Sequence, residues 1–304
     1  MAGIVNSGSF SKALWPGINA WYGDAFDEWD VEHTALFDQF TSRRQYEEDV
    51  SSSGTGLLMV KPEGQAIQYD TMLQGFTTRY THIEYALGII ITKIMVEDDQ
   101  YDVVGPKRAK SLAFSTRQTP EVVGANVYNR AFNSSYTGGD GKSMIASDHP
   151  NIAGGTYSNT PTTAANLSEA VLEQACIDIA RFNNDRGLKV KVTPRSIITA
   201  PDNEFELTRI LKSQYRVGTP NNDINALMSL GKFPEGVKIN HYLTSTTAWF
   251  IRTNVPDGLK HFTRSPVKFS EDNDWETSNA KFKVEYRDSF GWSEPRAIYG
   301  SAGV

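Results

Sequence analysis

The sequence predicts an α+β protein in which an extended N-terminal arm and a long β-hairpin come before the folded body. Three observations predict this class. Residues 1–45 carry many aromatic side chains without a regular hydrophobic period. Residues 46–84 combine β-branched and aromatic residues with turn-forming glycines. Residues 106–132 then form one long helical pattern, after which shorter helical and extended patterns interleave.

Residues 1–45 do not resemble the start of a compact domain. Their aromatic side chains stand among Gly, Pro and acidic residues, with one short helical pattern near residues 31–40. We expect these aromatics to be buried against another part of the fold or another chain. Five acidic residues also stand close together without a base, namely Asp24, Asp27, Glu28, Asp30 and Glu32. Two interpretations stay open: a solvated turn, or an acidic segment that faces basic groups of this fold or of another chain.

Residues 46–84 predict a long two-stranded hairpin. Extended patterns cover residues 57–61, 66–69 and 75–85, with a Pro-Glu-Gly turn at residues 62–64. Two arms of about 10 to 20 residues would project roughly 30 to 65 Å. Because so long a hairpin is marginally stable alone in water, we expect it to pack on a neighbour.

The body begins with an apolar strand at residues 87–94 and continues with the helix at residues 106–132, about 40 Å long. Pro120 lies inside this helix and is expected to kink it or split it. A Gly/Ser/Asn-rich loop follows at residues 133–159. The remaining predicted elements are a helix at residues 167–183 capped by Asn166 or Ser168, a helix at 203–213, and strands at 188–192, 196–200, 237–243, 249–252, 259–262, 267–269 and 281–287.

The composition excludes several classes of protein. The 304 residues are 39% hydrophobic and 22% charged, enough to bury a core in one large or two smaller domains. Thirty basic against thirty-six acidic residues give a formal net charge of −6, so only weak, non-specific contact with DNA is expected. The longest apolar run, residues 86–91, is far shorter than a membrane span, and the N-terminus lacks the pattern of a signal peptide. We therefore expect a soluble, non-secreted chain.

The motifs that suggest chemistry have simpler explanations. Residues 138–143 end like a phosphate-binding loop, but Tyr136 replaces the required glycine and a helix comes before rather than after them. Adjacent side chains at Ser-Asp-His 147–149 diverge, so they do not form a catalytic triad. Residues 272–276 alternate carboxylates but lack the glycine and terminal glutamate of an EF-hand, which favours a solvated turn.

Histidines and cysteine also give no sign of a catalytic or metal site. The single cysteine, Cys176, lies on the apolar face of the helix at 167–183 and is interpreted as a buried structural thiol. The histidines share no metal-ligand spacing; they are His33, His82, His149, His241 and His261. We therefore expect no enzyme, no cofactor and no metal.

Three sequence strings, taken with this order of elements, carry a resemblance to a known family. They are Gly-Ala-Asn-Val-Tyr-Asn-Arg-Ala-Phe-Asn at 124–133, Asp-Gly-Lys-Ser-Met-Ile-Ala-Ser-Asp-His-Pro at 140–150 and Phe-Gly-Trp-Ser at 290–293. Over nearly its whole length the chain resembles tailed-bacteriophage major capsid proteins with the Hong Kong-phage capsid fold. It is most similar to the Mu-like major head subunits, although Met144 or Ile145 stands where those subunits commonly have Leu.

The resemblance implies a division of the chain and a function. The implied parts are an N-arm at 1–45, an extended hairpin (E-loop) at 46–84, a peripheral (P) domain at 85–166 with its spine helix at 106–132, an axial (A) domain at 167–257, P-domain strands at 258–290 and an A-domain C-terminal segment at 291–304. The implied function is self-assembly into the pentamers and hexamers of an icosahedral head that encloses double-stranded DNA. The virion would be built in the host cytoplasm.

The implied partners are further copies of the chain, a separate scaffolding protein, a portal protein and a decoration protein. The separate scaffolding protein is expected because the arm begins almost at Met1. Two alternatives stay open: an encapsulin-like compartment shell with the same fold, and an unrelated α/β hydrolase or transferase.

Ten residues of the arm and hairpin are candidates for contacts between subunits. They are Trp15, Trp21, Phe26, Trp29, Arg43, Arg44, Lys61, Glu63, Tyr69 and Arg79. Charged groups at the hairpin turn are ordinarily solvated, but on a protruding hairpin they are also placed for ion pairs with a neighbour. Some relatives join subunits by a lysine–asparagine isopeptide bond; although Lys61 lies near the turn, we expect no such cross-link here.

Overall fold

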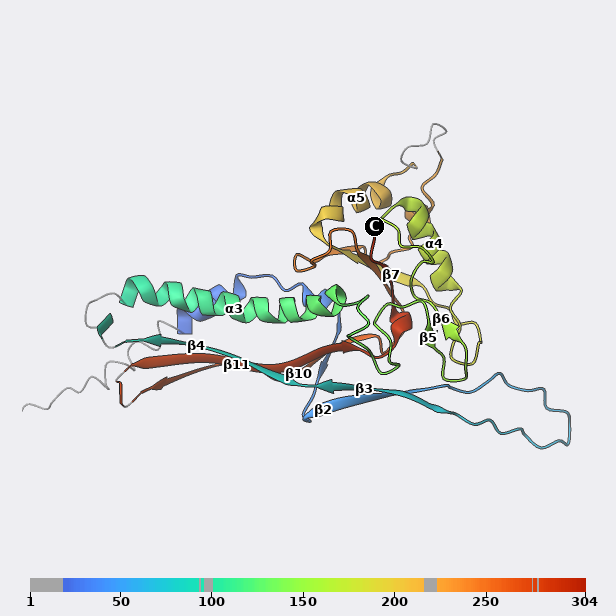
Figure 1. The fold of residues 1–304 in the computed structure, drawn as a ribbon, viewed down its shortest axis with the longest axis horizontal. Coiled ribbons are helices and arrows are strands. Elements are labelled where there is room, and N and C mark those ends of the chain that lie inside the picture. The colour runs from blue at the N-terminus through green and yellow to red at the C-terminus, as the bar shows by residue number, and fades with distance from the viewer. Residues whose placement is uncertain (1–18, 93, 96–100, 216–222, 275, 278) are drawn as a thin grey trace, which may run out of the picture.

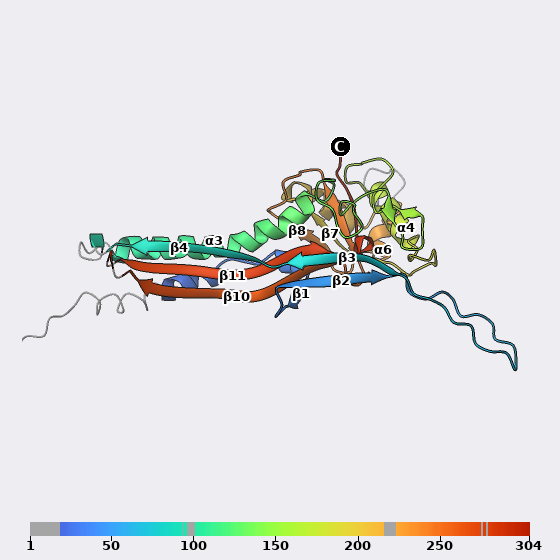
Figure 2. The ribbon, with the colours of Figure 1, turned by 60° about the horizontal axis from the view of Figure 1, so that its bottom comes forward.

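The computed structural model describes residues 19–92, 94–95, 101–215, 223–274, 276–277 and 279–304. Figure 1 shows an elongated α+β molecule, as predicted. A long helix lies along a layer of long strands at one end, a smaller α/β unit lies at the other, and a hairpin extends beyond that unit. In the view of Figure 2 the hairpin again projects away from the body.

The strand layer is a four-stranded sheet in the order β1-β10-β11-β4. Its centre is the antiparallel pair β10 (Leu259–Asn273) and β11 (Ala280–Trp292). The two predicted strands at 259–262 and 267–269 are thus one strand, irregular in register between Thr263 and Lys268. In β11 the residues alternate between buried and exposed, so Phe282, Val284 and Tyr286 share the face that the pattern predicted.

The edge strands come from distant parts of the chain. β4 (Ile83–Ile91) pairs antiparallel with β11 and begins four residues before the predicted strand at 87–94. β1 (Asp38–Thr41) pairs parallel with β10. The sheet therefore forms only when the first hundred residues meet the last fifty.

The long helix α3 (Tyr101–Asn129) confirms the predicted spine, shifted a few residues toward the N-terminus. It is one helix despite Pro120, so the alternative of two helices is wrong. The hydroxyls of Thr116 and Thr119 donate to the carbonyls of Leu112 and Ser115, each at 2.7 Å, in the turn where proline interrupts the backbone ladder.

The buried face of α3 packs on the sheet. Ala109 and Ala113 are fully buried, and small side chains let the helix approach the strands closely. Leu112 packs in the same cluster as Phe282 of β11 and Ile91 of β4. The hydrophobic effect on this face holds the helix to the layer.

Residues 19–41 of the arm pack on their own chain. The helix lies at residues 19–27, and the predicted helical stretch at 31–40 is wrong, since this segment holds the short 3-10 helix η1 (His33–Ala35) and β1. Leu36 and Phe37 are buried in a core shared with α3. The chain's own fold therefore buries part of the apolar groups of the arm, whereas Trp29 and Phe40 remain exposed.

A buried polar contact fixes the arm to α3. The backbone N–H of His33 donates to Glu121 Oε2 at 2.8 Å, and His33 Nδ1 lies 2.6 Å from Glu121 Oε1. Nearby, the Arg117 guanidinium covers the Phe26 ring at 3.6 Å and its Nε donates to the Phe26 carbonyl at 2.7 Å. Glu121 and Arg117, which make these contacts, are four residues apart and so lie on one face of α3.

The acidic residues of the arm divide between the two interpretations. Glu32 pairs with His241 of the α/β unit at 2.6 Å, and Asp27 lies 3.3 Å from Arg117. Asp24, Glu28 and Asp30 are exposed. Basic groups of the same fold thus face part of the segment, and solvent faces the rest.

The smaller unit is a four-stranded sheet in the order β12-β9-β7-β8 with helices packed on it. The strands are β7 (Pro194–Thr199), β8 (Val237–Ile239), β9 (Trp249–Thr253) and β12 (Ile298–Ser301), and the helices are α4 (Glu169–Ala180), α5 (Glu204–Lys212) and α6 (Ala226–Ser229). Ser168 is the N-cap of α4 and accepts from the N–H of Val171 at 3.3 Å, which selects one of the two predicted caps. The predicted strand at 188–192 is wrong, because this segment is a loop with Val190 exposed.

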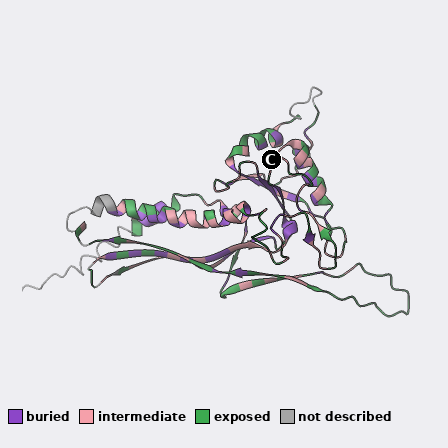
Figure 3. Ribbon diagram, viewed as in Figure 1, coloured by how far each residue is buried: buried purple, intermediate pink, exposed green. Residues whose placement is uncertain are grey.

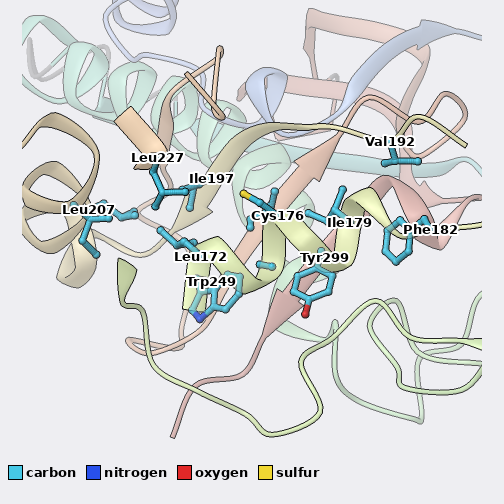
Figure 4. Close-up of a cluster of buried hydrophobic side chains, with 13 residues drawn as sticks. Leu172, Cys176, Ile179, Phe182, Val192, Ile197, Leu207, Leu227, Trp249 and Tyr299 are labelled. Atoms are coloured by element: carbon cyan, nitrogen blue, oxygen red, sulfur yellow. The ribbon is translucent and has the colours of Figure 1, made fainter. Parts of the chain in front are cut away.

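Figure 4 shows the core of this unit, in which Cys176 lies beside Ile179, Leu172 and Trp249. Burial raises the pKa of the Cys176 thiol to about 11. The structure thus confirms a buried thiol.

We expect the folded chain at pH 8 to resist alkylation at Cys176, since almost none of a thiol with this pKa is ionised and the thiolate is the nucleophile. Mass spectrometry after iodoacetamide treatment should find the native chain unmodified and the urea-unfolded chain modified once. Rapid modification of the native chain would contradict the buried position.

We expect Phe282→Ala to lower the free energy of unfolding by about 3–5 kcal/mol, because it leaves a cavity between β11 and α3. Urea denaturation of the unassembled chain measures this. The control is Lys283→Ala on the opposite face, where a change within about 0.5 kcal/mol is expected. Equal effects of the two variants would contradict the described packing.

We expect Glu121→Ala to loosen the arm, because it leaves the His33 backbone N–H and ring nitrogen without their buried acceptor. Leaving a buried donor without a partner costs about 1–3 kcal/mol of stability. Hydrogen exchange should accelerate at residues 32–37. Glu235→Ala, which removes the partly exposed partner of Arg195, is the control and should leave that segment unchanged. Unchanged exchange in both variants would mean that the contact does not hold the arm.

Candidate inter-subunit surface

The projecting hairpin begins as an antiparallel pair with one register shift, between Val50 and Ser52. β2 (Tyr46–Ser52) pairs with β3 (Gln74–Thr81), and Ser53 extends the pairing through its backbone N–H to the Leu73 carbonyl at 3.0 Å. The ladder ends at Gly54, whose φ of 65° lies in the left-handed region that favours glycine. Beyond it the chain follows an extended course without strand pairing, so the strands predicted at 57–61 and 66–69 are wrong.

We call residues 55–72 the hairpin tip. The predicted turn is present, closed by the N–H of Gln65 donating to the Pro62 carbonyl at 3.2 Å, with Gly64 in the left-handed region. Figure 3 shows the tip as a continuous exposed stretch. Its large apolar side chains are all exposed; they are Leu57, Leu58, Met59, Val60, Ile67, Tyr69 and Met72.

The degree of exposure in the tip is unusual for apolar residues. Leu58 is 100% and Val60 94% exposed, although both are typical core residues. Monomeric proteins rarely leave so many neighbouring apolar groups in water, and such patches mark surfaces for other chains. Burying each of these side chains in a partner would contribute about 1.5–3 kcal/mol.

The hairpin root, by contrast, is fixed to the sheet by polar contacts around one buried ammonium group. Lys260 of β10 is 5% exposed, and its ammonium lies 2.6 Å from Asp49 of β2 and 2.8 Å from Asp257. Ser293 donates to Asp49 at 2.6 Å and lies 2.6 Å from the Tyr80 hydroxyl of β3. Burial alone would lower the pKa of Lys260, but the bonds to Asp257 and Asp49 outweigh it and raise the pKa.

The glycine-rich loop at 138–143 packs on this hairpin. A Cβ at Gly139 would lie 2.6 Å from Thr78 Oγ1 and 2.8 Å from the Thr77 carbonyl of β3. The loop therefore needs glycine for close approach to a strand, not for a phosphate. The adjacent Ser-Asp-His side chains take separate partners, since Asp148 pairs with Lys142 and His149 Nδ1 lies 2.6 Å from Asp140.

The structure separates the ten candidate residues into three places. Lys61, Glu63 and Tyr69 are together in the exposed tip. Arg43, Arg44 and Arg79 lie at the root; Arg44 pairs with Glu47 at 3.6 Å and Arg79 with Glu48 at 2.6 Å. On the arm, Trp21 and Phe26 are half-buried on their own chain and Trp29 packs edge-on against Phe114 at 4.9 Å between ring centroids, whereas Trp15 lies outside the described residues.

Sequence reasoning named the charged turn but missed the residues beside it. The run of Leu57, Leu58, Met59 and Val60 was interpreted as a strand, not as a contact surface. A usable signal was present, because four successive apolar residues cannot all lie on the buried side of a two-stranded hairpin.

Within the described ranges, no three or more His, Cys, Asp or Glu side chains are grouped so as to hold a metal ion. In the same part of the chain, no helix has the length and apolar character to cross a membrane.

Comparisons with known proteins agree with this geometry. A family model described as phage capsid protein matches residues 75–301. No curated protein matches the chain. Solved structures with similar folds include a procapsid chain of bacteriophage JBD30, with a TM-score of 0.53 and 13% identity over 96% of this chain and 75% of that chain.

Two further capsid structures have similar folds. The capsid of a native GTA particle gives a TM-score of 0.52 and 10% identity over 88% of each chain. The capsid of cyanophage P-SCSP1u gives 0.50 and 9% identity over 87% of this chain and 85% of that chain. These likenesses show the tailed-phage capsid fold, while placement in the Mu-like group stays a prediction. Since the family model spans more than half of the sequence, the chain belongs to the phage capsid protein family.

Proposed function

We propose that this phage capsid protein is the major head subunit and assembles into the pentamers and hexamers of an icosahedral shell around double-stranded DNA. The observation that carries the proposal is the hairpin tip, where large apolar side chains lie in water on a segment that projects beyond the body. In a shell, each tip would lie next to another copy of the chain, which would bury these side chains.

The shape of the subunit favours rings over closed dimers. The tip projects beyond the body at one end of the subunit, and we propose that it contacts a body surface of the next copy rather than a second tip. Such head-to-tail contacts close into rings when repeated by rotation. Obligate interfaces of this kind commonly bury about 2,000–5,000 Å².

The domain division proposed for this function follows the two sheets. The spine helix α3 and strands β4, β10 and β11 share one layer, which supports a P domain built from 85–166 and 258–290. β12 pairs with β9, which supports an A domain completed by 291–304. The N-arm at 1–45 and the E-loop at 46–84 would then link neighbouring copies.

The proposed partners beyond other copies are a separate scaffolding protein, a portal protein and a decoration protein. The net charge of −6 supports only weak, non-specific contact with packaged DNA, because tight contact requires many basic groups facing phosphates. Assembly would take place in the host cytoplasm. The family match favours a phage head over an encapsulin-like compartment and supports a structural rather than an enzymatic role.

The chain should be expressed alone and together with its neighbouring genes, and the products examined by size-exclusion chromatography and negative-stain electron microscopy. Shells, tubes or five- and six-fold rings are expected. A uniform monomer or dimer, even with a scaffolding protein present, would contradict the proposal. Shells filled with a cargo enzyme instead of DNA would support the encapsulin-like alternative.

We expect Leu58→Asp combined with Val60→Asp to reduce shell yield at least about tenfold, because each change removes about 1.5–3 kcal/mol of apolar burial per contact. The melting temperature of the unassembled chain should not change, since both side chains are exposed. The matched control, Gln65→Asp with Gln68→Asp, adds the same charge to exposed polar positions of the tip and should still assemble. Equal loss in both double variants would mean that charge, not apolar burial, decides assembly.

A further inference from the structure

Arg186 connects the hairpin tip to the α/β unit. Arg186 donates from one guanidinium nitrogen to Asp70 Oδ2 at 2.7 Å and from the other to the Thr71 carbonyl. The same Asp70 oxygen accepts the N–H of Gly56 at 2.7 Å, from the opposite side of the tip. Asp70 therefore joins both sides of the tip to one side chain of the body.

The turn that presents Arg186 is well fixed. Asn184 Oδ1 accepts the backbone N–H of Arg186 at 3.0 Å and that of Leu188 at 2.9 Å, and Gly187 has a left-handed φ of 78°. The neighbouring Asp185 receives a bond of 3.0 Å from Arg296, which is only 7% exposed. The guanidinium thus comes from a platform held by the core of the α/β unit.

The tip needs such a second attachment. Its ladder stops at Ser53 and Leu73, and Gly54 follows in a conformation that few other residues adopt. The root is fixed by Lys260, but one fixed end leaves the direction of the tip undetermined. Contact at Asp70 and Thr71 supplies the second point that sets the direction.

We propose that the contact of Arg186 with Asp70 and Thr71 is a releasable latch that sets the angle of the hairpin tip and so selects the assembly product. The inference rests on the proposed head function. Rings of five and of six copies place the neighbour of each tip at different angles, so a single rigid tip fits only one of them.

The side chains of Arg186 and Asp70 are exposed enough for their ion pair to break. The Arg186 side chain is 21% and the Asp70 side chain 46% exposed, so water and the charges of a neighbour compete for both groups. The Gly56 N–H, followed by Arg186, lowers the pKa of Asp70, so the carboxylate stays ionised at neutral pH.

The first test measures the tip angle in unassembled protein. Spin labels at Lys61→Cys in the tip and Ala180→Cys on α4 report one tip-to-body distance, and the buried Cys176 does not interfere. We expect a narrow distance distribution in the parent chain, a broad one in Arg186→Ala and an intermediate one in Arg186→Lys. Arg209→Ala, which removes a more exposed ion pair with Glu206 of the same unit and does not touch the tip, is the control and should stay narrow.

The second test measures assembly of the same variants by electron microscopy. The fraction of closed shells of uniform diameter should fall about two- to fivefold in Arg186→Ala, as expected from loss of one exposed ion pair, and not in Arg209→Ala. An unchanged distance distribution in Arg186→Ala would overturn the latch. A broadened distribution with unchanged shells would overturn its role in assembly. If the parent chain forms no shells, the head function is contradicted, and the distance measurement alone decides whether the latch exists.

Discussion

The buried ammonium of Lys260 is the interaction on which the architecture depends. Taking a charge out of water is costly unless it is paired, and here two carboxylates from different segments, Asp49 and Asp257, supply the pairing. Lys260 also lies opposite Asp38 and Gly291 in the strand register, so its position couples the arm, the hairpin and the central strands. If the hairpin shifted in register, this charge would be left without Asp49.

The fixed root lies at the base of a hairpin whose tip projects beyond the body. Asp49, Tyr80 and Ser293 hold the paired part of the hairpin against the sheet, and the apolar side chains of the tip beyond it are exposed in the subunit. The free energy of burying those side chains becomes available in contact with another molecule. The arm behaves differently from residue 19 onward, since Glu121 and Arg117 hold it to its own spine helix.

Local patterns in the sequence predicted the elements whose stability is local. The small and apolar residues of α3 and the alternation at Phe282, Val284 and Tyr286 repeat within a few positions, and both elements were placed correctly. The tip was misassigned because β propensity at 57–60 does not reveal that Gly54 ends the ladder. The root cluster was out of reach, because Lys260 and Asp49 are 211 positions apart and only the folded topology brings them together. The function was predicted from the resemblance of residues 124–133 and 140–150 to a known family, because the sequence contains no catalytic or ligand-binding motif that indicates it.

The pairing of β1 with β10 and of β4 with β11 also determines when the subunit folds. Both edge strands lie in the first hundred residues, and both central strands lie after residue 258. Such long-range pairing is slow and cannot begin while the partner strands are still being synthesised. The chain must therefore be synthesised through β11, to residue 292, before the layer can close. A chain that stops before residue 259 has neither central strand and cannot form this sheet.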